Sequence, residues 1–301
     1  MVSPISGTGD DMTTKSVQGA SGSSTVSTVI ALHCSLGSGN QWARLSEELA
    51  ATHQVIAPDI SGYGNNPGAF DLPTTLSEEV SLLRDRLGEA VGPIHLVGHS
   101  YGGALAFKIA TDSSLASRVR SLTLIEPVLP TILHENGPDR PLYEHFVRLA
   151  HAVSEDLWNG LASDAIDKFL VFWKGSEAKE DVSPKARMRM MEHADKLAFD
   201  FTAVLAEQNV TRAAAAIRAP TLLASGGLSP YLTQRILWRL TSAIPEVRTR
   251  HVPSAGHMLP VSHPDAINPD IVRHISRADE LALLLLLPGE MPAEAGASLK
   301  A

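Results

Sequence analysis

The chain has 301 residues, enough for one large domain or two ordinary ones, and its 44% of hydrophobic and 19% of charged residues are typical of a globular protein. A formal charge of −8 excludes a basic surface that would attract nucleic acid or an anionic membrane, so we expect neither as a partner. A single cysteine, Cys34, excludes an intrachain disulfide and a zinc knuckle, and we expect a cytoplasmic protein. The longest apolar run, 281–287, is shorter than the ~20 residues of a membrane span.

Residues 1–26 are rich in Gly, Ser and Thr and lack the apolar core of a signal peptide, which predicts a flexible N-terminal lead-in. After them, short apolar runs alternate with stretches of helical periodicity. Ser77 followed by Val80 makes no capping box, so the sequence leaves the start of the helix there undefined. The expected strands are 29–32, 53–59, 94–98, 119–125, 221–225 and 247–252, and the expected helices are 40–51, 77–87, 101–111, 231–241 and 267–275.

This alternation predicts an α/β fold, with a mostly parallel central sheet and helices on both faces. It is broken between 129 and 212, where we expect helices over 142–153, 161–173 and 184–208 and no strand. We interpret that stretch as a helical lid, or cap, over one end of the sheet. The predicted core is then 27–128 and 213–278, and 279–301 is a C-terminal tail.

A G-x-S-x-G pattern runs from Gly98 to Gly102 and places Ser100 between an expected strand and an expected helix. A serine on so sharp a turn adopts strained backbone angles and needs neighbours without bulk, which the two glycines supply. The following helix points its N-terminus at the serine, where negative charge develops during attack on a carbonyl. This context predicts that Ser100 is a nucleophile.

Five motifs along the chain carry a resemblance to a known family. They are His33-Cys-Ser-Leu-Gly-Ser-Gly-Asn-Gln-Trp42, Ala57-Pro-Asp-Ile-Ser-Gly-Tyr-Gly64, Gly98-His-Ser-Tyr-Gly-Gly103, Leu122-Thr-Leu-Ile-Glu-Pro127 and Ala255-Gly-His-Met258. With them the chain resembles the α/β-hydrolase superfamily over residues 27–278, and within it the serine esterase-like subgroup with a His-Ser-Ser-type oxyanion loop. The resemblance implies the α/β-hydrolase fold and hydrolysis of an ester or similar acyl bond, but it implies no particular substrate.

A serine is a poor nucleophile unless a base takes its proton, and the chain has 12 histidines. His257 follows the last expected strand in a loop of small residues, at the place where the superfamily has its base. His99 is adjacent to the serine in sequence, but its side chain should point away from the serine's side. His33 is expected to hydrogen-bond to loop backbone. We therefore predict that His257 is the base.

The third member of the triad must orient the base and stabilise its imidazolium. Many superfamily members have this acid after the strand that here ends at Ser225, but residues 226–230 contain no carboxylate. Glu126 directly follows the strand 119–125, a position that some branches use for their acid, and an ionisable residue there needs a partner. The chain order Ser100, Glu126, His257 is the order of this fold. We predict Glu126 as the acid; the alternative is a structural salt bridge near the lid.

Two other residues near the base are less suited to that role. Ser229 stands where an Asp is expected, and its hydroxyl could orient an imidazole but could not balance its charge. Asp265 lies eight residues beyond the base and is expected to cap the next helix.

An oxyanion hole needs two backbone N–H groups. Tyr101, directly after the nucleophile, is expected to supply one, and Ser35 in the loop after the first strand the other. Many relatives have His-Gly-x in this loop, whereas this chain has Cys34 in place of the glycine. The Ser35 hydroxyl could add a third donor, and we interpret Cys34 as a small apolar filler.

The expected lid holds eight of the 15 aromatic residues, which would pack it onto the core and line an apolar pocket. We therefore expect a small-molecule ester as substrate, and a monomer or homodimer. No cofactor and no metal is expected, because the sequence shows no clustered His, Asp and Glu spacing. The eight are Tyr143, Phe146, Trp158, Phe169, Phe172, Trp173, Phe199 and Phe201.

Two alternatives to ester hydrolysis stay open. A carbon–carbon bond hydrolase or a perhydrolase would use the same triad. A non-catalytic ligand-binding or receptor protein on a hydrolase scaffold would explain the missing acid after Ser225, but the serine, the base and the oxyanion loop oppose it.

Overall fold

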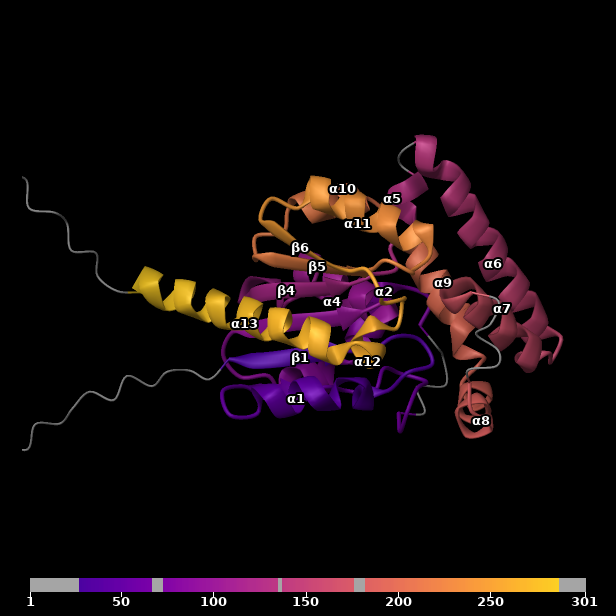
Figure 1. Ribbon diagram of the computed structural model, residues 1–301, viewed down its shortest axis with the longest axis horizontal. Helices are drawn as coiled ribbons and strands as arrows, with labels where there is room; N and C mark the ends of the chain where they lie inside the picture. Colours follow the sequence, from indigo (N-terminus) through magenta and orange to yellow (C-terminus); the bar gives the residue numbers. More distant parts are fainter. Residues whose placement is uncertain (1–26, 67–72, 135–136, 176–181, 287–301) are drawn as a thin grey trace, which may run out of the picture.

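The computed structural model describes residues 27–66, 73–134, 137–175 and 182–286, so the predicted lead-in 1–26 lies outside the described residues. A six-stranded sheet in the order β2-β1-β3-β4-β5-β6 forms its centre, and every neighbouring pair is parallel. The predicted α/β class is therefore confirmed (Figure 1). The strands are β1 Thr28–Leu32, β2 Gln54–Ile56, β3 Ile94–His99, β4 Val119–Ile125, β5 Thr221–Gly226 and β6 Val247–Val252.

A helix follows each strand of the described residues. They are α1 Ala43–Leu49, α2 Leu76–Leu82, α3 Arg84–Gly88, α4 Tyr101–Thr111, α5 Thr131–His134, α6 Arg140–Trp158, α7 Ala162–Lys174, α8 Pro184–Glu192, α9 Lys196–Ala206, α10 Val210–Ala215, α11 Tyr231–Ala243, α12 Leu259–Ser262 and α13 Pro264–Leu286. Short 3₁₀ helices are η1 Gly39–Trp42, η2 Ala116–Arg118 and η3 Gly137–Asp139.

The two faces of the sheet are covered by different helices. Successive side chains of a strand point to opposite faces, and in β1 this places Val29 and Ala31 in one hydrophobic cluster and Ile30 and Leu32 in the other. Helices α1 and α13 complete the first cluster, and α2, α3, α4 and α11 contribute to the second. The inner strand β1 is therefore apolar on both sides, as its uninterrupted apolar run predicts.

One helix boundary differs from the expectation because the cap, Thr75, lies two residues before Ser77. The Thr75 side chain accepts from the Glu78 backbone N–H, and the Glu78 carboxylate accepts from the Thr75 backbone N–H. This capping box begins α2 at Leu76 and supplies the helix start that the sequence left undefined. The expected single helix over 77–87 is two helices, α2 and α3.

The helical insertion, by which we mean α5 to α10, occupies the stretch between β4 and β5. Its described residues contain helices and no strand. Figure 1 shows α6, α7, α8 and α9 gathered at one end of the sheet, near α12. The chain reaches α12 directly after β6, so this is the end at which the carboxyl termini of the parallel strands lie.

The C-terminal boundary needs a correction. A tail was expected from residue 279, but α13 continues through this position to Leu286 and extends beyond the sheet (Figure 1). Asp279 on this helix bonds to side chains at the opposite end of the sheet from the helical insertion, which fixes that part of α13. Among the helices of the described residues, none is both long and apolar enough to span a membrane.

Candidate functional site

Ser100 lies on the turn between β3 and α4, at the carboxyl end of a central strand. Its φ of 58° and ψ of −118° are strained for a residue with a side chain. A Cβ on Gly98 would lie 2.3 Å from the Gly102 carbonyl oxygen, and one on Gly102 would lie 2.3 Å from the carbonyl oxygen of Leu32. The turn therefore excludes side chains at the two positions where the sequence has glycine.

The structure brings the three predicted triad residues together. The Nε2 atom of His257 lies 2.9 Å from Ser100 Oγ, and its Nδ1 atom lies 2.6 Å from Glu126 Oε2. A carboxylate can only accept, so Nδ1 carries the proton and donates, and Nε2 is left to accept from the serine hydroxyl. All three side chains are buried. Their catalytic roles stay a prediction, but the hydrogen-bond order is the one that a serine nucleophile requires.

Glu126 takes its position from the strand arrangement. It directly follows β4, which pairs with β3, and it has a positive φ of 45°. Its second oxygen, Oε1, accepts from the Gly226 N–H at 2.7 Å, so the end of β5 holds the carboxylate in place. The loop that usually carries the acid thus contributes a backbone donor in this protein.

The two weaker candidates for the acid make no hydrogen bond to His257. The Ser229 hydroxyl is buried and has no hydrogen-bond partner among the described residues. Asp265 lies in the first turn of α13 and pairs with Arg44. The structure thus gives neither side chain a hydrogen bond to the imidazole.

Two rings lie against His257. The indole of Trp173, on α7, stacks on the imidazole with ring centroids 4.1 Å apart and an interplanar angle of 17°. His99 donates from Nε2 to the backbone carbonyl of His257 at 2.8 Å, and its ring centroid lies 5.1 Å from that of His257. Burial, with the neighbouring His257, lowers the pKa of His99 well below its usual range, so His99 is neutral. The stack with Trp173 was not predicted, although Trp173 was among the lid aromatics.

The loop after β1 and the start of α4 meet beside the nucleophile. Within the described part of the chain, the backbone N–H groups of Ser35 and Tyr101 donate to no protein acceptor. The Ser35 hydroxyl donates to Asp200 Oδ2 at 2.5 Å, so the idea that it adds a third oxyanion donor is wrong.

The other two residues of that loop have structural contacts. His33 binds backbone as expected: its Nδ1 lies 2.8 Å from the Cys34 carbonyl, and its Nε2 accepts from the Ile60 N–H at 2.9 Å. Burial raises the pKa of the Cys34 thiol to about 12, which keeps it protonated and a poor nucleophile.

Two cavities open next to Ser100. The first is a nearly filled apolar pocket with about 20 Å³ of free space, and the second is a cleft of about 710 Å³ with more polar walls. Ser100, Ser35, Phe169 and Trp173 line both of them. The first is closed by Tyr101, Val128, Phe146, Leu197, Asp200, Phe201 and Val204, and the second includes Gln41, Asn65, Lys174, Arg189, His193 and His257.

A buried ion cluster, absent from the sequence prediction, reaches the wall of the apolar pocket. Lys196 on α9 donates to Glu79 Oε2 at 2.8 Å and to Asp200 Oδ1 at 2.5 Å. Burial raises the pKa of Glu79, and although burial alone would lower the pKa of Lys196, the two carboxylates outweigh it and raise it. In the sequence, Lys196 and Asp200 have the i,i+4 spacing of an ordinary surface pair, so no pattern marked them.

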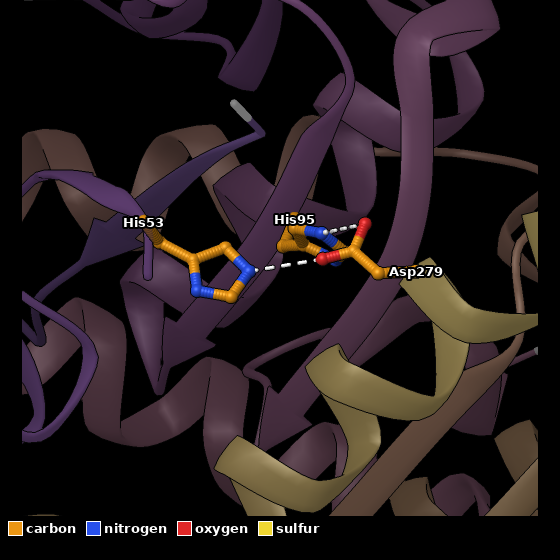
Figure 2. Close-up of side chains that lie close together, drawn as sticks. All are labelled: His53, His95 and Asp279. Carbon is orange, nitrogen blue, oxygen red and sulfur yellow. Dashed lines mark hydrogen bonds and ion pairs between the residues drawn. The ribbon is translucent and has the colours of Figure 1, made fainter. Parts of the chain in front are cut away.

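A second cluster lies away from this site. Figure 2 shows His53 and His95 directed at Asp279. Within the described ranges, these three residues are the only group of three or more His, Cys, Asp or Glu side chains whose ligand atoms lie close enough together to hold a metal ion. The distances are those of hydrogen bonds, 3.0 and 3.2 Å from the Nε2 atoms to the carboxylate oxygens, and Arg120 donates to the same carboxylate at 2.6 Å. Because Arg120 already balances the charge of Asp279, we interpret the cluster as a clasp between α13 and the sheet. Sequence spacing could not reveal it.

This clasp should make stability depend on pH. Although burial alone would raise the pKa of Asp279, hydrogen bonds from His95 and Arg120 outweigh it and hold this pKa well below its usual range. A carboxyl with a lowered pKa stabilises the fold above its unfolded pKa of about 3.9, and this contribution is lost as the pH falls below that value. We expect Asp279→Asn to unfold at lower denaturant concentration at pH 7, with a difference from wild type that shrinks below about pH 4.

The matched control is Asp265→Asn, which removes an exposed carboxylate from the start of the same helix. Its free energy of unfolding should stay close to that of wild type at every pH, because exposed ion pairs contribute little to stability. Urea unfolding of the three proteins between pH 2.5 and 7 measures both effects. A difference for Asp279→Asn that did not change with pH would contradict the clasp.

Comparison with known proteins identifies the family of this fold. The model of the alpha/beta hydrolase fold family matches residues 27–264, and the chain belongs to this family. Lipase LipV of Mycobacterium tuberculosis is 34% identical over 102 residues, which are 34% of this chain and 37% of LipV. The match therefore spans little more than a third of that protein. The protein named "Putative carbamate hydrolase RutD" from Azorhizobium caulinodans is 26% identical over 277 residues, 84% of this chain and 93% of RutD.

Solved structures share the fold at low sequence identity. MenH from S. aureus aligns with a TM-score of 0.67 and 16% identity, covering 84% of this chain and 95% of MenH. A thermophilic esterase from Thermogutta terrifontis aligns with a TM-score of 0.60 and 21% identity, covering 85% of this chain and 92% of the esterase. These likenesses show the fold alone.

Proposed function

We propose that the protein is a serine hydrolase that cleaves a carboxylic ester, or a related acyl bond, of a small and largely apolar substrate. The observation that carries the proposal is the hydrogen-bond chain from Ser100 through His257 to Glu126, which begins at a serine that lines two cavities. The same relay activates serine on several unrelated folds.

The proposed reaction has two steps. Ser100 Oγ attacks the acyl carbon while His257 Nε2 takes the hydroxyl proton, and the N–H groups of Ser35 and Tyr101 bind the oxygen that becomes negative. The bond to the alcohol then breaks, and His257 returns its proton to the leaving oxygen. Water attacks the acyl-enzyme with His257 again as base, which releases the acid and restores Ser100. Throughout, Glu126 stabilises the imidazolium.

The two cavities suggest how a substrate divides between them. The pocket beside Val128, Phe146 and Phe201 is apolar and nearly filled, so it suits a short acyl group. The larger cleft, which includes Gln41 and Asn65, has room for the other half of the molecule. We therefore expect esters of short to medium acids to be preferred over those of long-chain acids.

Activity on a panel of p-nitrophenyl esters of rising acyl length tests the proposal. We expect kcat/KM to be highest between acetate and butyrate and to fall at least tenfold by decanoate. A p-nitrophenyl carbamate belongs in the panel, because relatives named as carbamate hydrolases match most of this chain and a carbamate carbonyl could undergo the same two steps. Faster turnover of emulsified triolein than of the butyrate ester would contradict the chain-length preference. A non-catalytic receptor would turn over none of them.

A further inference from the structure

Three charged side chains are buried together where α9 of the helical insertion meets α2. The side chains of Glu79, Lys196 and Asp200 are at most 6% exposed, and Lys196 bridges the two carboxylates. Removing ions from water is expensive, and a well-packed apolar group is often as stable. The proposed reaction does not use these charges directly, so their position beside the nucleophile needs another explanation.

Each residue expected to form the oxyanion hole is tied to this cluster by its side chain. Ser35 Oγ donates to Asp200 Oδ2 at 2.5 Å. Tyr101 OH donates to Glu79 Oε2 at 3.2 Å, and Lys196 Nζ lies 4.9 Å from the centroid of the Tyr101 ring. The loop after β1 and the first turn of α4 are therefore held by one bridged pair of carboxylates.

Asp200 has little free capacity to bind a substrate directly, because three donors occupy three of the roughly four acceptor sites of its carboxylate. Its Oδ1 accepts from Lys196, and its Oδ2 accepts from both Ser35 and the Tyr63 hydroxyl, the latter at 2.6 Å. A lone carboxylate at this place would also oppose the negative charge that develops on the substrate oxygen, and the ammonium of Lys196, which Asp200 shares with Glu79, offsets part of that effect. Orientation of the loop, rather than recognition of the substrate, is the role that these contacts allow.

We propose that Glu79, Lys196 and Asp200 are positioning residues that fix the positions of the two N–H groups expected to form the oxyanion hole. They do so only while α9 is packed against α2. The proposal rests on the proposed function of Ser100. It explains why a chain segment outside the core reaches the back of the oxyanion loop, and it makes the helical insertion part of the catalytic geometry. Misplacement of such donors by about 1 Å can cost on the order of 100-fold in rate.

Two conservative variants separate positioning from simple stabilisation. Ser35→Ala removes the bond from the oxyanion loop to Asp200 and keeps the backbone N–H, whereas Tyr63→Phe removes the other hydroxyl from the same oxygen, Asp200 Oδ2. We expect kcat to fall about tenfold in Ser35→Ala with KM within twofold of wild type, because ground-state binding is unchanged. In Tyr63→Phe, kcat should stay within twofold, although both variants lose stability.

A trifluoromethyl ketone reports on the oxyanion hole directly, because its adduct with the serine carries the tetrahedral oxygen. Its inhibition constant should rise about tenfold in Ser35→Ala and should not change in Tyr63→Phe. In a double-mutant cycle, the loss of kcat in the Ser35→Ala, Asp200→Asn double variant should be little more than the larger of the losses in the two single variants. If Asp200→Asn does not fold, the comparison of Ser35→Ala with Tyr63→Phe is by itself sufficient to test the proposal.

The proposal is overturned if Ser35→Ala keeps the kcat and the inhibitor affinity of wild type. It is also overturned if Tyr63→Phe loses as much kcat and as much inhibitor affinity as Ser35→Ala does. A double variant whose fold-loss in kcat equals the product of the two single fold-losses would also overturn it, since Ser35 and Asp200 would then act independently. Failure of the proposed function looks different: wild type itself would hydrolyse no ester of the panel and bind no trifluoromethyl ketone.

Discussion

Ser100→Ala should reduce ester hydrolysis by more than about 10⁴-fold while the protein stays folded. The hydroxyl is the atom that would form the acyl bond, so no neighbouring group can replace it, and what remains is the contribution of substrate binding and the oxyanion hole. The change removes one oxygen atom at the pocket wall and leaves the core unaltered. Initial rates with p-nitrophenyl butyrate, together with thermal unfolding of both proteins, measure the two parts of the prediction.

A fluorophosphonate probe provides an independent readout, because it forms a bond only with an activated serine. Wild type should gain one adduct on the peptide that contains Ser100, and Ser100→Ala should gain none. Ser100→Gly is the matched control for folding: it is equally inactive, but glycine tolerates the φ of 58°, so it should be more stable than Ser100→Ala by about 1 kcal/mol. A folded Ser100→Ala protein with more than a few percent of wild-type activity would show that another nucleophile is used.

The sheet and its helices could be predicted because local patterns determine them. Runs such as Val29 to Leu32 are apolar on both faces, and the glycines around Ser100 mark a turn in which the structure leaves no room for a Cβ. The roles of Glu126 and His257 could be predicted from the resemblance to the α/β-hydrolase superfamily, together with the expectation that parallel strands bring their carboxyl ends to one edge.

The contacts made by the helical insertion could not be predicted in this way. Lys196 and Asp200 look like a solvated helix pair, and only the packing of α9 against α2 buries them against Glu79. Trp173 was one of eight aromatic residues in its segment, and no spacing distinguishes the ring that stacks on His257 from those that pack the core. His95 and Asp279 are separated by 184 positions, so only the folded chain relates them.

The identity of the triad acid yields the second large effect. Glu126→Gln should lower kcat by on the order of 10²- to 10⁴-fold while the protein keeps its fold. A glutamine oxygen could still accept from the Gly226 N–H, but its amide would then face Nδ1 of His257 as a donor. That nitrogen would have to accept, which moves the imidazole proton to Nε2 and leaves no lone pair for the serine hydroxyl.

Two control variants make the test specific to Glu126. Ser229→Ala alters the loop that usually carries the acid and should cost less than about tenfold, because its hydroxyl makes no bond among the described residues. Asp265→Asn removes the carboxylate that pairs with Arg44 and should leave kcat unchanged. Steady-state kinetics of the three variants with one p-nitrophenyl ester give the comparison. If Glu126→Gln stayed active while either control lost activity, the carboxylate that orients His257 would have to be sought elsewhere, and the 2.6 Å bond to Glu126 would be a structural contact only.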